Sequence, residues 1–148
     1  MDIAKKLGAY SLWIILALLS AWAFVLGRSV MLTVLANYAG TSFTRNNQAR
    51  FLNLFFSIVL GLAWFVFVIT SEGRIRKGIK KDRVLEYFLR LAGPLLLFLF
   101  SLDMVIFIYQ RFALVDWVRL LILITELGLG VICVYFGWST RSPLLKKA

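Results

Sequence analysis

Residues 91–110 (LAGPLLLFLFSLDMVIFIYQ) and residues 118–138 (VRLLILITELGLGVICVYFGW) decide the fold of this chain. Both segments are apolar over about 20 residues, the length that a helix needs to cross the hydrocarbon core of a bilayer. Each segment also contains one acid, Asp103 in the first and Glu126 in the second. A charged side chain inside hydrocarbon is costly, so each acid is a candidate functional group.

The composition of the whole chain points to the same class of protein. Hydrophobic residues make up 61% of the 148 residues, against about 45–50% in soluble domains. They form blocks of membrane-spanning length, and polar segments separate the blocks. The sequence therefore predicts an all-α membrane protein with one domain, residues 1–148, and four transmembrane helices at about residues 8–27, 51–70, 91–110 and 118–138.

The distribution of charge predicts an orientation in the membrane. Lys and Arg number 17 against 7 acids, which gives a net charge of +10. Most of these basic residues lie near the N-terminus, in residues 71–90 and in the C-terminal tail, and basic segments normally stay on the cytoplasmic side. We therefore expect a multi-pass protein of the cell or inner membrane with both termini in the cytoplasm. Because the positive charge lies between apolar blocks, nucleic acid is not an expected partner.

The connection between the second and third predicted spans, residues 71–90, is the most basic one. It holds seven basic residues, more than the orientation of the chain in the membrane alone requires: Arg74, Arg76, Lys77, Lys80, Lys81, Arg83 and Arg90. Apolar residues on one face of 82–92 predict a short amphipathic helix in the headgroup region before the third span. We expect Gly93-Pro94 to separate this helix from the span, since proline disfavours helical geometry in the residue before it. Anionic lipid headgroups or an acidic cytoplasmic protein are the expected partners of such a segment.

The connection at residues 28–50 is compatible with two structures. Either the first helix continues past Arg28, or residues 30–38 lie in the membrane interface, because a helix over 8–38 would be about 46 Å long. We expect a turn at residues 40–42 and a solvated loop at residues 45–48.

The depths of the two acids match. Asp103 lies 7 residues before Gln110, and Glu126 lies 8 residues after Val118. The two carboxyl groups are therefore expected about 10 and 12 Å below the same membrane surface, on neighbouring antiparallel helices. Whether they face each other depends on helix rotation, which the sequence does not determine.

Three hypotheses account for the two acids. In the first, they are protonated or hydrogen-bonded and fix helix packing, within the chain or against a partner. In the second, an arginine from the outer rim pairs with each acid, and the candidates are Arg28, Arg50 and Arg119. In the third, the acids share a proton or a cation and mark a transport path, because two close carboxylates do not both stay ionised.

The absence of histidine and of known catalytic motifs narrows the range of expected functions. The chain has no His, so we predict neither a His-ligated haem nor a His-based metal site, and no cofactor. It has no phosphate-binding loop and no nucleophile elbow, so we predict no catalytic residues and do not expect an enzyme. The leading prediction is a small integral membrane subunit that assembles into a larger complex, as a homo-oligomer or an accessory chain. The alternative is an ion- or proton-coupled transporter or channel protomer that uses Asp103 and Glu126, and a membrane-embedded enzyme comes third.

Overall fold

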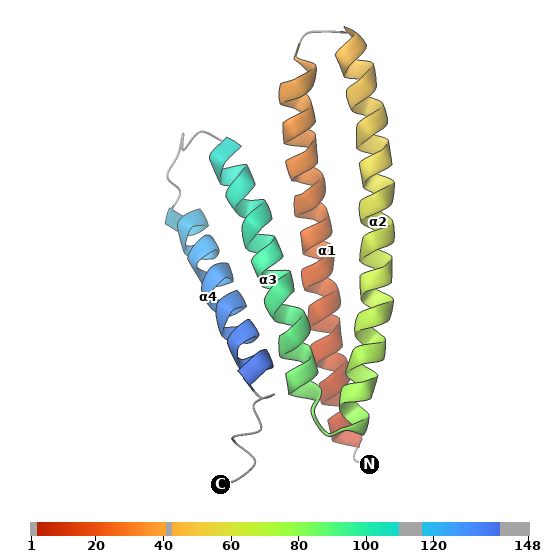
Figure 1. Ribbon diagram of the computed structural model, residues 1–148, viewed down its shortest axis with the longest axis vertical. Coiled ribbons are helices and arrows are strands. Elements are labelled where there is room, and N and C mark those ends of the chain that lie inside the picture. Colours follow the sequence, from red (N-terminus) through yellow and green to blue (C-terminus); the bar gives the residue numbers. More distant parts are fainter. Residues whose placement is uncertain (1–2, 41–42, 110–116, 140–148) are drawn as a thin grey trace.

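The computed structural model describes residues 3–40, 43–109 and 117–139, and it is helical throughout these ranges apart from short turns. The helices are α1 (Ile3–Ala39), α2 (Phe43–Lys80), α3 (Val84–Tyr109) and α4 (Trp117–Ser139). Each helix runs antiparallel to the one before it, so the start of α1 and the end of α4 lie at the same end of the bundle (Figure 1). All four are long and apolar enough to cross a membrane. The predicted all-helical architecture with four candidate spans is therefore confirmed.

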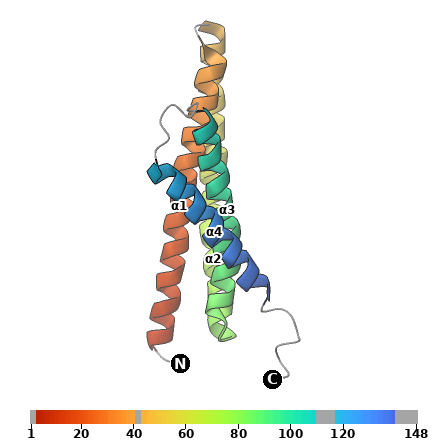
Figure 2. The ribbon, with the colours of Figure 1, turned by 90° about the vertical axis from the view of Figure 1, so that its left-hand side faces the viewer.

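The α1–α2 hairpin is longer than predicted and rises beyond α3 and α4 (Figure 2). The first helix does continue past Arg28, to Ala39, and Gly40 ends it with a positive φ of 49°. The predicted solvated loop at residues 45–48 is wrong, because these residues lie in the first turns of α2. Ala39 and Ala49 are buried together with Leu35. This small apolar cluster extends the hairpin interface through a segment that is polar in sequence.

The corner between α2 and α3 is much tighter than the predicted connection at residues 71–90. α2 continues to Lys80, so only residues 81–83 connect the two helices. The backbone N–H of Arg83 donates to the carbonyl oxygen of Gly78 at 3.0 Å, and Asp82 has a positive φ of 55°. A Cβ on Gly78 would lie 3.1 Å from Cα of Val84, so the turn is tightly packed there. Buried Ile75 fixes the last turns of α2 against α1 and α3.

α3 passes through Gly93-Pro94 as one helix, so the predicted separation at this site is wrong. The lost backbone hydrogen bond is tolerated because Leu91, Ala92 and Gly93 are buried against neighbouring helices, which hold the helical geometry. Residues 84–92 are thus the first turns of α3. Their position in the headgroup region stays a prediction.

α3 is the central helix of the bundle. It packs against α1, α2 and α4, whereas the backbone of α4 closely approaches that of α3 alone within the described ranges. Glycines bring α3 and α4 together. A Cβ on Gly93 would lie 2.7 Å from Cγ2 of Val134, and one on Gly130 would lie 2.9 Å from Cδ2 of Leu97. Nε of Arg90 in α3 also donates to the carbonyl oxygen of Gly137 in α4 at 2.7 Å.

Candidate functional site

A cavity opens where α4 and α1 diverge over α3. Its volume is about 400 Å³, and it is lined by Trp22, Leu26 and Ser29 of α1, Asp103, Ile106 and Phe107 of α3, and Arg119, Ile122 and Leu123 of α4. We call this space the polar groove. Asp103 lies 6 residues before the end of α3, which places it about 9 Å along the helix from that end. An acid and an arginine therefore line a groove within the apolar part of the bundle.

The structure brings Asp103 and Glu126 together. Their carboxyl groups lie close enough to interact with each other, and the guanidinium of Arg119 lies close enough to attract the carboxylate of Asp103. A hydrogen bond between two carboxyl groups requires a proton on one of them, since ionised carboxylates only accept. Oε2 of Glu126 is buried and has no hydrogen-bond partner in the described part of the chain. A proton shared with Asp103 would supply the missing donor.

The three candidate arginines are placed differently. Arg119 joins the cluster, with Asp103 as its partner rather than Glu126, the acid on its own helix. Arg28 and Arg50 are exposed, on α1 and on α2. Sequence reasoning missed Trp22 and Ser29 as lining residues. No local pattern marks them, because they reach the groove only through the packing of α1 beside α3.

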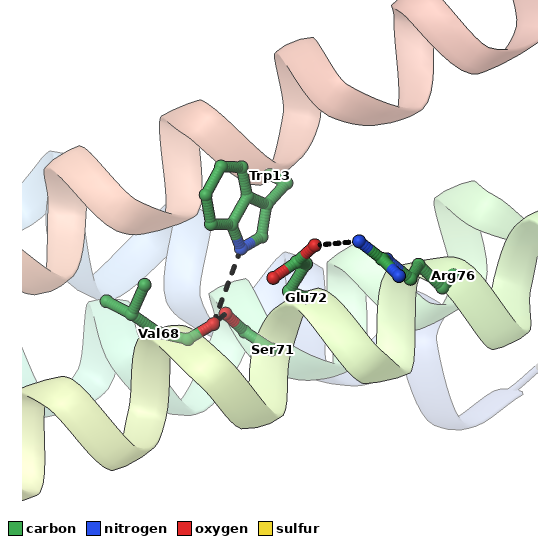
Figure 3. Close-up of polar contacts among 5 residues, drawn as sticks. All are labelled: Trp13, Val68, Ser71, Glu72 and Arg76. Carbon is green, nitrogen blue, oxygen red and sulfur yellow. Dashed lines mark hydrogen bonds and ion pairs between the residues drawn. The ribbon is translucent and has the colours of Figure 1, made fainter.

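At the opposite end of the bundle, polar contacts tie α1 to α2 (Figure 3). The indole Nε1 of Trp13 donates to the carbonyl oxygen of Val68 at 3.5 Å, and the hydroxyl of Ser71 donates to the same oxygen at 2.8 Å. One turn further, Arg76 forms an ion pair with Glu72 at 2.6 Å. Glu72 is thereby neutralised within its own helix, and this end keeps its excess of positive charge.

We call this end of the bundle, where α1 begins and α2 ends, the basic end. Two acids that the structure describes at this end are paired locally: Glu86 with Arg90 and Arg83, and Asp82 with Lys5 at 3.2 Å. Five further basic residues at this end are exposed: Lys6, Arg74, Lys77, Lys80 and Lys81. The predicted basic connection therefore folds into the last turns of α2, the corner and the first turns of α3. It presents a concentrated positive surface.

A second cavity lies at the basic end, between the start of α1 and the corner. Its volume is about 710 Å³, and its lining residues are Lys5, Gly8, Ala9, Leu12, Ile79, Asp82, Val84 and Leu85. We call it the basic-end cleft. Apart from the Lys5–Asp82 ion pair, its lining side chains are apolar. It therefore combines an apolar floor with a charged rim.

The chain matches no protein-family model, no curated protein and no solved structure. Within residues 3–40, 43–109 and 117–139, no three His, Cys, Asp or Glu side chains gather where they could hold a metal ion. The function is therefore inferred from the polar groove and the basic end themselves.

Proposed function

We propose that this chain is a subunit of a larger membrane complex, and that a transmembrane segment of another chain covers the polar groove. The other chain is a second copy or a different membrane protein. The observation that carries the proposal is the presence of Asp103 and Arg119 in a groove at the edge of the bundle. Ionisable side chains within spans almost always face protein or a water-filled cavity, not lipid.

The packing of α4 supports a partner at this place. α4 packs along α3, and its backbone does not approach α1 in the described ranges. Ile106 and Leu123, on the floor of the groove, are already buried, whereas Ile122 on its rim is 45% exposed. The groove thus has a packed floor and an open side. A further helix would bury the open side without displacing any helix of this chain.

The energetics of the ionisable side chains within the spans also favour a partner. A charged residue in the middle of a span costs about 2.5–3.5 kcal/mol on the insertion scale, and the pairing of Asp103 with Arg119 offsets part of that. A hydrogen bond between helices in lipid contributes about 0.6 kcal/mol on average. A partner that excludes lipid and donates to Glu126 would therefore stabilise the assembly modestly through its polar contacts. Close packing would have to contribute the rest.

We further propose an orientation of the chain in the membrane. With the basic end in the cytoplasm, α1 begins and α4 ends on the cytoplasmic side, as positive-inside placement favours. The polar groove then lies near the opposite surface of the membrane. The partner segment would contact this chain in that half of the bilayer.

A second function, as an ion- or proton-coupled carrier, is favoured by a separate observation. Asp103 and Glu126 interact directly, from two antiparallel helices, beside a cavity. Such a pair can exchange one proton or bind one cation without moving the backbone. This function would need an open path from the pair to both sides of the membrane.

Photo-crosslinking tests the subunit proposal. Ile122 and Ile124 lie on opposite flanks of α4, and only Ile122 lines the polar groove. Replacing each in turn with the photo-crosslinking residue benzoylphenylalanine, in membranes that hold two differently tagged copies of the chain, should give a discrete protein adduct from position 122 only. An adduct joining both tags identifies a second copy, and one with a single tag identifies another chain. Equal labelling at both positions, or lipid adducts alone, would refute the proposal.

The two candidate functions are separated by a double change. Asp103→Asn with Glu126→Gln should remove the adduct at position 122 if the acids hold the partner. If the adduct persists while proton or cation flux into liposomes is lost, the carrier function replaces the subunit function.

A further inference from the structure

We propose that the basic-end cleft binds one anionic phospholipid, with the phosphate at Lys5 and an acyl chain along the apolar floor. This proposal does not depend on assembly, because the cleft lies at the opposite end of the bundle from the polar groove. It rests on the shape and lining of the cleft, on the nature of its ion pair and on the surrounding charge.

The floor of the cleft suits a hydrocarbon chain. Ala9 and Leu12 of α1 line it together with Ile79 of α2 and Val84 of α3. Its volume of about 710 Å³ is within the usual range of ligand sites. Gly8 contributes space, because a Cβ built on it would meet nothing within 4 Å. An apolar space of this size at the end of a membrane bundle is more favourably filled by lipid than by water.

The ion pair on the rim is easily exchanged. Nζ of Lys5 and Oδ1 of Asp82 are 3.2 Å apart, and the two side chains are 59% and 80% exposed. Exposed pairs of this kind contribute little to stability. A phosphate group offers Lys5 stronger, charge-assisted hydrogen bonds than a solvated carboxylate does. The backbone of Asp82 is fixed in the corner by its N–H bond to the carbonyl oxygen of Ile79 at 3.3 Å, so the cleft keeps its shape when the pair opens.

The surrounding charge selects an anion. Lys6 follows Lys5 and Lys80-Lys81 precedes Asp82 in the sequence, and all three lysines are exposed. Phosphate chemistry also occurs in soluble anions, but the apolar floor favours a phosphate that carries acyl chains. The structure therefore points to a phospholipid with a net negative headgroup, such as phosphatidylglycerol, over a zwitterionic one.

Native mass spectrometry of the full chain in detergent, with added dioleoyl phosphatidylglycerol or dioleoyl phosphatidylcholine, tests this site. The wild-type chain should retain one phosphatidylglycerol in preference to phosphatidylcholine. Lys5→Gln should weaken that binding by about fivefold, the effect of one basic residue at an anionic surface. Lys6→Gln removes the same charge outside the cleft and should have a clearly smaller effect.

A second pair of variants tests the apolar floor without changing charge. Gly8→Leu fills the cleft, and Gly73→Leu adds the same side chain on α2 outside it, where a Cβ also meets nothing within 4 Å. We expect Gly8→Leu to weaken binding at least as much as Lys5→Gln, and Gly73→Leu to leave it unchanged. Both leucine variants should elute from size exclusion as the wild type does.

Four outcomes would overturn the proposal. Equal losses for Lys5→Gln and Lys6→Gln, with none for Gly8→Leu, would indicate diffuse attraction to anionic lipid. Displacement of the lipid by excess inorganic phosphate would indicate a site for a soluble anion. An acidic peptide, polyglutamate, that binds through Lys5 and is insensitive to Gly8→Leu would indicate a protein-docking surface. Equal retention of the two lipids would remove the role of charge.

Discussion

Gly93→Ala should separate α3 from α4, because the added methyl group meets the backbone of α4. The new Cβ would lie 2.9 Å from the backbone nitrogen of Val134 and 2.7 Å from its Cγ2. The side-chain atom can move, but the backbone atom cannot move without the whole helix. Overpacking of this kind costs about 1–3 kcal/mol. The Arg90–Gly137 hydrogen bond, which spans the same interface, would lengthen as the helices part.

A matched variant removes the effect of helix propensity. Alanine is favoured over glycine in helices by about 1 kcal/mol, which would offset part of the cost at Gly93. Gly128→Ala makes the same chemical change in α4, at a position where a Cβ meets nothing within 4 Å. The difference between the two variants therefore isolates the packing cost, and we expect it to be about 1–3 kcal/mol.

The single cysteine provides the assay. Cys133 is partly buried, and its backbone carbon would lie 3.3 Å from the new Cβ of Gly93→Ala. The rate at which a thiol-reactive dye labels Cys133 in detergent therefore reports the opening of α3 from α4. We expect labelling in the Gly93→Ala variant to be faster than in Gly128→Ala, by at most the roughly 5- to 150-fold that a cost of about 1–3 kcal/mol corresponds to, because the partly exposed thiol also reacts in the closed state. Identical labelling rates would refute the close approach of the two helices.

Two further predictions concern single side chains. Arg90→Gln removes a charged donor from the carbonyl oxygen of Gly137 and an ion pair from Glu86. It should lower the free energy of unfolding by about 1.5–3 kcal/mol and speed hydrogen exchange in the last turns of α4, whereas Lys77→Gln, at an exposed side chain, should do neither. Unchanged exchange in both variants would contradict the contact between Arg90 and Gly137. Leu99 is only 1% exposed, and Leu99→Ala should lower the free energy of unfolding by about 2 kcal/mol. This is near the low end for cavity-forming substitutions, because lipid also surrounds the leucine side chain when the helices separate. Thermal unfolding compares it with Leu129→Ala, which is 48% exposed; equal losses would show that Leu99 is not part of the core.

The spans could be predicted because length and apolar composition are local properties. The helical extensions at residues 45–48 and 71–80 could not, because they depend on burial against another helix. Ala49 is buried against Ala39, and Ile75 against Ala9 and Leu91. In each contact the two partners lie on different helices, so the residue pattern within either helix does not reveal the contact. Polar and basic residues around these contacts therefore indicated loops.

The candidate site, like the fold, could be predicted only in part. Matching depths of Asp103 and Glu126 follow from residue counts along two antiparallel helices. Their direct interaction follows from the rotation of α3 and α4, which the glycine contacts at Gly93 and Gly130 set. The predicted break of the helix at Pro94 was wrong for a related reason. Tertiary contacts of the neighbouring residues outweigh the local preference of proline against helical geometry.

The two hairpins of the molecule differ in length. α1 has 37 residues and α3 has 26, so α1 is longer by roughly 16 Å at about 1.5 Å per residue. If α3 matches the thickness of the bilayer, the tip around Arg45 and Asn46 stands clear of the lipid in water. Any domain or tag attached at that tip would be held at a set height above the membrane by a rigid two-helix stalk, within reach of soluble proteins too large to approach the lipid surface.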